Sequence, residues 1–166
     1  MNTSIAPPQL GPNVLVILDK SPGFLDALRS VAASLPYIPH TLFTLFCCCP
    51  TRYWEHGGAD DPDVKRQLED AWEAAEKEFD LARHCLNQAR SVLQDAGVPD
   101  SHICTRISTE EDSLIAATTA EVRARHYSGV IVHRSHDDIV NRLLQKGVTD
   151  RFRRLPEVEV WAIDTE

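Results

Sequence analysis

The chain has 166 residues, a mass of 18.6 kDa and a formal net charge of −8. Its length fits one domain with a full hydrophobic core, because single domains cluster around 100–150 residues. The acidic charge argues against a sequence-independent nucleic-acid surface, which needs clustered Lys and Arg. The longest apolar stretches are of strand length, well short of the roughly 20 residues that a membrane helix needs. We therefore expect a soluble, cytoplasmic protein with neither nucleic acid nor a membrane as partner.

Residues 1–12 are rich in proline and polar residues and show no periodicity, which predicts a flexible N-terminal tail ahead of one domain over 13–166. Apolar periodicity then predicts strands at residues 14–18, 42–47, 103–107, 129–132 and 158–163. It predicts helices that begin at Ser21–Pro22, span 63–96, pass through 114–122 and span 139–154. Alternating strands and helices form parallel sheets through right-handed crossovers. The predicted fold is thus an α/β, Rossmann-like three-layer sandwich, with a five-stranded parallel sheet and helices on both faces.

The helix over 63–96 is the longest predicted element, and its apolar residues recur at three- and four-residue steps. They are Val64, Leu68, Trp72, Ala75, Phe79, Ala82, Leu86, Ala89 and Leu93. Its first turn is acidic and Gly97 follows its end, as the helix dipole and a C-cap favour.

Five cysteines include the run Cys47–Cys49 and form no CxxC pair, which is typical of reduced thiols in a cytosol. On a strand, Cys47 and Cys49 face one side and Cys48 the other, so a three-thiol metal cluster would require the strand to break. The plainer interpretation is three small buried side chains.

Ligands of parallel α/β sheets bind beyond the carboxyl ends of the strands. These ends are predicted at Asp19, at Cys47–Cys49, at Ile107–Ser108 and at His133–Arg134. Candidate binding residues are therefore sought there, and above all in the strand-to-helix stretch VHRSHDDIVNRLLQKG, residues 132–147.

Four stretches in this order resemble the universal stress protein family: VLVILDKS, ARHCLNQARSVLQDAGV, YSGVIVHRS and RLLQKGVT. The resemblance covers residues 13–164. It implies the five-stranded fold already predicted, and a homodimer that pairs through the last strand across a two-fold axis. That strand is apolar enough to need a cover, because an open apolar edge invites aggregation. The dimer residues implied are Val158, Val160, Trp161, Ala162 and Ile163.

ATP-binding members of that family carry Gly, two residues, Gly, nine residues, Gly and then Ser or Thr. The matching positions in this chain are His133, His136, Lys146 and Gly147, so the spacing is kept while the glycines are replaced. A β-carbon at each position adds bulk where backbone N–H groups approach phosphate. The resemblance thus implies a degenerate loop that does not bind ATP in the usual way. Asp19 matches an acidic residue near adenosine, although it also suits a simple turn cap, and Cys47 matches a residue that touches adenine.

The same residues also allow other kinds of site. Arg134, His136 and Lys146 could bind an anion such as ATP or AMP through side chains, with slow hydrolysis. His133 and His136 could be a metal pair, although no third ligand is visible. A cysteine near a histidine could form a thiol dyad, and the three cysteines a redox or metal sensor. The plainest interpretation is exposed polar residues that fill an inactive pocket.

No nucleophile elbow, P-loop or paired carboxylates with an evident partner occur in the sequence. We therefore expect a non-catalytic stress-response or signalling domain, homodimeric, with a protein partner of unknown kind. No cofactor is predicted, and ATP or AMP is the alternative ligand.

Overall fold

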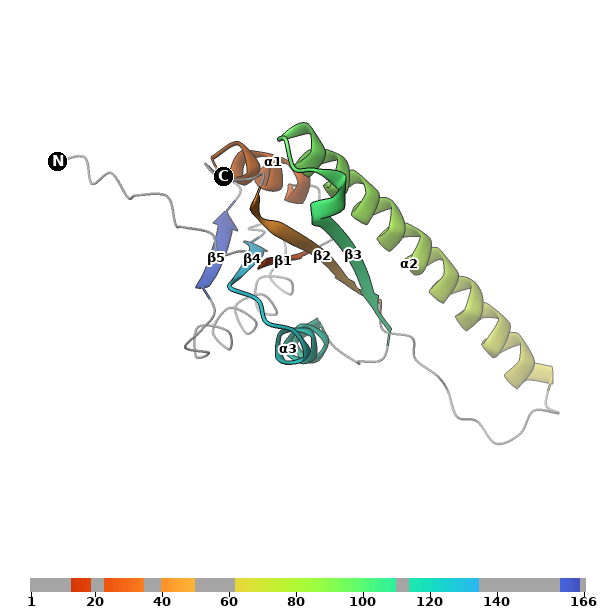
Figure 1. Cartoon of the computed structure of the whole chain (residues 1–166). Coiled ribbons are helices and arrows are strands. Elements are labelled where there is room, and N and C mark those ends of the chain that lie inside the picture. Colours follow the sequence, from red (N-terminus) through yellow and green to blue (C-terminus); the bar gives the residue numbers. More distant parts are fainter. Residues whose placement is uncertain are drawn as a thin grey trace.

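The structure is a computed structural model that describes residues 13–18, 23–34, 40–49, 62–109, 114–134 and 159–164. Five parallel strands form one sheet in the order β3-β2-β1-β4-β5 (Figure 1). The strands are β1 (Asn13–Ile17), β2 (Leu42–Cys48), β3 (Ile103–Ser108), β4 (Gly129–Arg134) and β5 (Glu159–Asp164). This order and direction confirm the predicted parallel α/β sheet.

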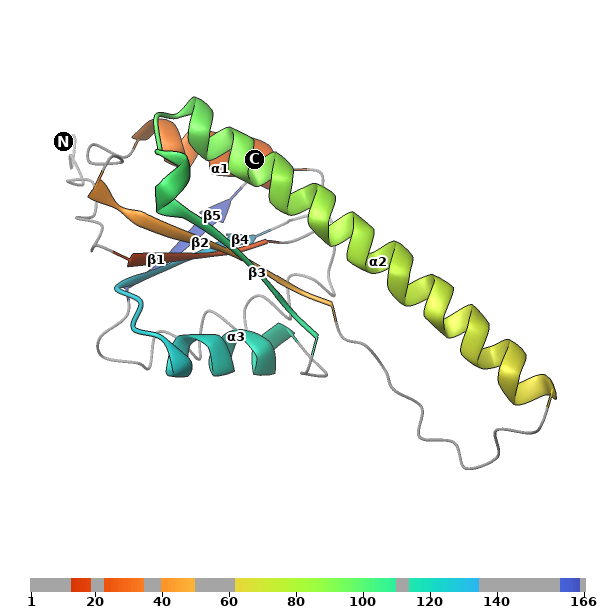
Figure 2. The ribbon, with the colours of Figure 1, turned by 45° about the vertical axis from the view of Figure 1, so that its right-hand side comes forward.

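Helices cover both faces of the sheet. Figure 2 shows α1 (Phe24–Ser34) and α2 (Pro62–Asp95) on one face and α3 (Leu114–Ala124) on the other. A short 3-10 helix, η2 (Asp100–His102), leads from α2 into β3. The predicted tail at 1–12 and the predicted helix at 139–154 lie outside the described residues. In the described part of the chain, no helix is both long and apolar enough to cross a membrane.

Two layers of buried side chains explain why β1 is apolar from Val14 to Ile17. Val14 and Val16 belong to the core under α1 and α2, whereas Leu15 and Ile17 belong to the core under α3. Successive strand residues point to opposite faces, so a strand covered on both faces has no position left for a polar side chain. The continuous apolar run at 14–18 is therefore a central strand of a parallel sheet, as predicted.

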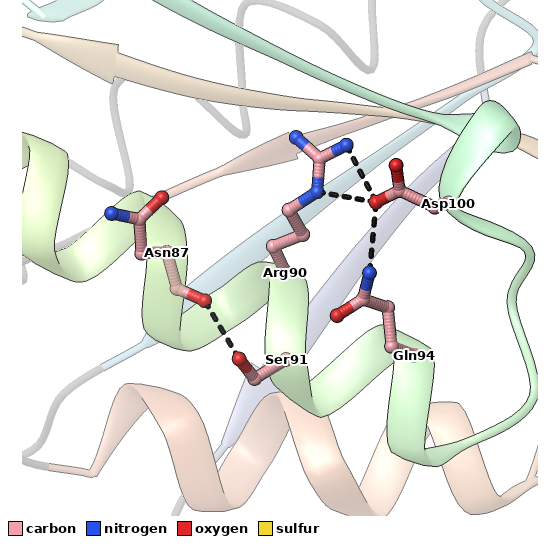
Figure 3. Close-up of polar contacts among 5 residues, drawn as sticks. All are labelled: Asn87, Arg90, Ser91, Gln94 and Asp100. Atoms are coloured by element: carbon pink, nitrogen blue, oxygen red, sulfur yellow. Dashed lines mark hydrogen bonds and ion pairs between the residues drawn. The ribbon is translucent and has the colours of Figure 1, made fainter.

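The C-terminal end of α2 is fixed by a glycine and an ion pair. Gly97 has a φ of 96°, a conformation that glycine adopts without strain. The Val98 N–H donates to the Leu93 carbonyl and the Gly97 N–H to the Gln94 carbonyl, the pattern of a Schellman cap. Figure 3 shows Asp100 accepting from Arg90 and Gln94, while the Ser91 hydroxyl donates to the Asn87 carbonyl. These contacts set the direction in which the chain enters β3.

Only the second half of α2 packs on the sheet. Its buried residues are Ala82, Leu86, Ala89, Val92 and Leu93. The first half projects past the sheet in both views (Figures 1 and 2), and Trp72 there is 70% exposed. The predicted helix is confirmed, but its apolar stripe continues well beyond the sheet that it covers.

Candidate functional site

The strand order reverses between β1 and β4. From β1 the chain crosses through α1 to β2 on one side, and from β3 it returns through α3 on the opposite face to β4. In open α/β sheets such a reversal is the topological switch point, and ligands bind there beyond the carboxyl ends of the strands. The candidate site is therefore the edge where β1 and β4 end.

Three of the candidate binding residues fall on described strands near this edge. Cys47 lies on β2, and His133 and Arg134 are the last two residues of β4. The strand prediction at 129–132 was two residues short, because β5 gives His133 and Arg134 partners in register, Ile163 and Asp164. Other candidate residues lie outside the described part of the chain: Asp19, His136, Lys146, Gly147 and Val158.

His133 is buried, with only 1% of its surface exposed. The interpretation of His133 as an exposed polar residue in an inactive pocket is therefore wrong. Because β4 continues to Arg134, His133 faces the same side of the sheet as Ile131, toward α1. Its imidazole meets the ring of Phe24 edge to face, with centroids 5.8 Å apart and planes at 72°.

This contact fills space at the switch point. Phe24 is the first residue of α1, the helix that follows β1, and it is itself almost fully buried. The pair thus joins the end of β4 to the start of α1, across the two strands where the order reverses. A glycine at position 133 would leave the volume of the imidazole open; here a ring occupies it.

The three consecutive cysteines lie at the carboxyl end of β2, with Cys49 just after its last residue. Cys47 and Cys49 are buried in the core under α1 and α2, whereas Cys48 packs against the core under α3, which confirms the predicted alternation. The Cys49 thiol lies 3.8 Å from the Glu78 carbonyl, to which it donates. Among the described residues, no three His, Cys, Asp or Glu side chains gather closely enough to hold a metal ion.

A polar cluster that the sequence reasoning missed lies under the opposite face of the sheet. Glu121 of α3 is buried, and its Oε1 accepts the Tyr127 hydroxyl at 2.8 Å. The same oxygen lies 3.1 Å from Nε of Arg106 and 3.4 Å from Nε of Arg125. The pKa of Tyr127 is raised to about 12, mainly by burial; a hydrogen bond to Thr44 works against this rise, and the hydrogen bond to Glu121 adds to it.

A cavity of about 230 Å³ lies beside this cluster, between β3 and α3. Its lining residues are Phe46, Arg106, Ile107, Ser108, Thr109, Ala117, Ala120, Glu121 and Ala124. The spacing of Glu121 and Arg125, one helical turn apart, is a sequence signal that could have indicated their ion pair. Arg106 comes from β3, so only the fold brings it to Glu121, whereas Tyr127 lies just beyond the end of α3, six residues after Glu121.

No protein-family model matches the sequence, and no curated protein matches it. Among solved structures, a universal stress protein family member from Burkholderia pseudomallei is 19% identical to this chain; the match covers 92% of this chain and 95% of that one, with a TM-score of 0.53. A universal stress protein in complex with cAMP is 15% identical over 95% of this chain and 99% of its own, with a TM-score of 0.58. The universal stress protein from Archaeoglobus fulgidus in complex with dAMP is 13% identical over 93% of this chain and 98% of its own, also with a TM-score of 0.58. The chain has the universal stress protein fold.

The universal stress protein fold agrees with the resemblance seen in the four stretches, and it extends over nearly the whole chain. Two of these structures hold an adenine nucleotide, cAMP in one and dAMP in the other. In this chain, the edge where β1 and β4 end carries the buried pair of His133 and Phe24.

Proposed function

We propose that this chain is a non-catalytic stress-response or signalling domain of the universal stress protein type that does not bind ATP through a glycine loop. The observation that carries the proposal is the burial of His133 against Phe24. His133 stands where ATP-binding members of the family have the first glycine of their loop. A buried ring there replaces the open space that a close approach of phosphate to the backbone needs.

The other two glycine positions support the same conclusion. They are His136 and Lys146, each with a β-carbon and a long side chain. One replaced glycine could be accommodated by a small shift of the loop, whereas three remove the cradle of backbone N–H groups altogether. With no catalytic motif in the sequence either, the proposed role depends on contacts between proteins rather than on chemistry.

The proposed assembly is a homodimer through β5. This strand is last in the sheet order, so in the described part of the chain one of its edges has no partner strand. Residues 160–163 read Val-Trp-Ala-Ile, an apolar sequence that is unusual for an open edge. The other edge strand, β3, instead exposes Cys104, Thr105 and Arg106. Pairing of two β5 strands across a two-fold axis covers the apolar edge in a closed dimer.

The cAMP and dAMP complexes of related structures favour a second candidate, an adenine-nucleotide binder. In this chain the phosphate contacts would come from side chains, those of Arg134, His136 and Lys146, rather than from a glycine loop. Cations bind phosphate strongly through charge-assisted hydrogen bonds, so the arrangement is chemically sound. The two candidates differ in one measurable property, which is the affinity for nucleotides.

A thermal-shift series separates them. The melting temperature of the purified protein is measured alone and with millimolar ATP, AMP, cAMP or inorganic phosphate, each with and without magnesium. A ligand at 1,000 times its Kd stabilises the folded state by about 4 kcal/mol, which shifts the melting temperature by several degrees. We expect no shift with any of the four. A shift that disappears in Arg134→Ala and Lys146→Ala would establish the nucleotide binder instead.

A further inference from the structure

The first sixteen residues of α2, 62–77, form an arm that leaves the sheet. Contact with the core begins at Glu78, whose carbonyl accepts the Cys49 thiol, and at Phe79, which packs against the core. At about 1.5 Å per residue the arm is roughly 24 Å long. It projects past β2 and β3 in both views of the molecule (Figures 1 and 2).

The arm keeps the apolar stripe of the helix although the sheet does not cover it. The stripe consists of Val64, Leu68, Ala71, Trp72 and Ala75. These residues follow three- and four-residue steps and continue without a break into the buried stripe that begins at Ala82. Trp72 exposes 70% of its surface, more than Leu42 or Leu81, the other large apolar residues that are exposed in the described part of the chain. The other four residues of the stripe are half-buried, so Trp72 is its exposed residue. A large apolar side chain exposed on a projecting helix, beside further apolar residues, suits contact with another molecule.

The charges around Trp72 are all negative. Residues 68–76 include Glu69, Asp70, Glu73 and Glu76 and no basic residue, and the basic residues of the arm, Lys65, Arg66 and Lys77, lie outside this window. Glu69 precedes Trp72 by three positions and Glu76 follows it by four, so both carboxylates neighbour the indole on the helix surface. An arginine laid on an indole face between two carboxylates gains a cation–π contact and charged hydrogen bonds together. The local chemistry of the arm is thus complementary to a basic side chain beside apolar ones.

We propose that the arm is a docking surface for a basic amphipathic helix of a partner protein. An arginine of that helix lies on Trp72 between Glu69 and Glu76, and its apolar residues cover Leu68 and Ala75. Around Trp72 itself two copies would bring four carboxylates against four, which disfavours a second copy centred there. Lys65, Arg66 and Lys77 lie nearer the ends of the arm, so a second copy is kept as an outcome of the test. Tryptophan and arginine are the residues that most often dominate binding energy at such contacts. The inference deepens the proposed signalling role and rests on it, since it names the kind of partner.

The test is a titration with a defined peptide. The probe is an 18-residue peptide of leucine and arginine, with leucine at three- and four-residue steps and a fluorescent label. A scrambled peptide of the same composition lacks the apolar stripe. Fluorescence anisotropy measures binding to the full chain and to three variants: Trp72→Ala, Glu69→Gln with Glu76→Gln, and Leu81→Ala. Leu81 is the matched control, because it is 46% exposed on the same helix but lies off the stripe.

We expect the amphipathic peptide to bind the wild type, and Trp72→Ala to weaken binding about tenfold or more. The double glutamine variant should weaken binding several-fold and flatten its dependence on salt, while Leu81→Ala should change nothing. Absence of binding, equal binding of the scrambled peptide, or equal effects of Trp72→Ala and Leu81→Ala would each overturn the proposal. So would light scattering that shows a wild-type dimer split by Trp72→Ala, since the occupant would then be a second copy. Nucleotide titrations probe the other site, so a failure there is seen separately.

Discussion

His133, the fifth residue of β4, packs its imidazole edge to face on Phe24, the first residue of α1. The two residues are more than one hundred positions apart in sequence, yet they meet where the strand order of the sheet reverses. In a sheet of this kind that place is reserved for ligands. Here two buried rings pack against each other at that edge, so the pair contributes to the stability of the fold.

The first prediction concerns this pair. His133→Ala should lower the free energy of unfolding by about 2–3 kcal/mol, because it removes a buried ring, its edge-to-face contact and the packing around it. His84→Ala is the control, since His84 is exposed on α2 and should change stability by less than about 0.5 kcal/mol. Urea denaturation measures both. If His133→Ala lowered the free energy of unfolding as little as His84→Ala, the contact between His133 and Phe24 would not be part of the core.

The second prediction is that Glu121 contributes to the free energy of unfolding through its contacts with Tyr127, Arg106 and Arg125. Glu121→Gln weakens the hydrogen bond from Tyr127 and the contacts with two half-exposed arginines, so we expect a loss of about 1–2 kcal/mol. Combined with Tyr127→Phe, the double variant should lose less than the sum of the two single variants, because both remove the same hydrogen bond. Arg123→Gln on the exposed face of α3 serves as control. If urea denaturation showed that the losses of the two single variants simply add up in the double variant, the hydrogen bond between Tyr127 and Glu121 would be contradicted.

The titration of Tyr127 gives a separate test. Its folded pKa of about 12 lies above the ordinary value near 10, so the folded state favours the protonated phenol. This contribution to stability is fully present below about pH 10 and is lost as the pH rises to about 12, because the unfolded chain releases the proton first. The ultraviolet absorbance of phenolate should show one step near pH 12 that Tyr127→Phe removes. A step that stays in this variant would assign it to another tyrosine.

The proposed dimer predicts a mass by light scattering of twice the 18.6 kDa of one chain at micromolar concentration. Val160→Glu places a charge on β5 and should weaken the dimer about tenfold or more. Thr105→Glu places the same charge on β3, the opposite edge of the sheet, and should leave the mass unchanged. A monomeric wild-type chain would contradict the proposed dimer. So would a loss of mass that is the same for Val160→Glu and Thr105→Glu.

The fold could be predicted from the sequence because its strands are covered on both faces. The apolar run at β1 and the stripe of α2 depend only on chain-local periodicity, and Gly97 marks the helix end through its own backbone conformation. The end of β4 was missed for a physical reason. His133 and Arg134 are polar, but pairing with β5, about thirty residues further on, keeps them in the sheet.

The site was harder to predict than the fold. Cys47 and Cys49 were correctly expected to share a face, since alternation along a strand decides this locally. The burial of His133 depends on Phe24, and one ion pair of Glu121 depends on Arg106. Both are contacts between distant segments, which periodicity does not reveal. Tyr127 is only six residues from Glu121, but it lies beyond the end of α3, where helical spacing no longer applies. The reach of α2 beyond the sheet likewise depends on where β2 and β3 end, not on the helix itself.

The most direct test of the proposed function is calorimetric titration of the purified chain with magnesium ATP, repeated on Lys146→Gly. We expect no heat of binding with the wild type, because the proposed loop carries His133, His136 and Lys146 where a phosphate cradle has three glycines. Micromolar binding by the wild type that is lost in Lys146→Gly would contradict it. Side chains would then have taken over the task of the glycines, and the chain would be a nucleotide-binding protein.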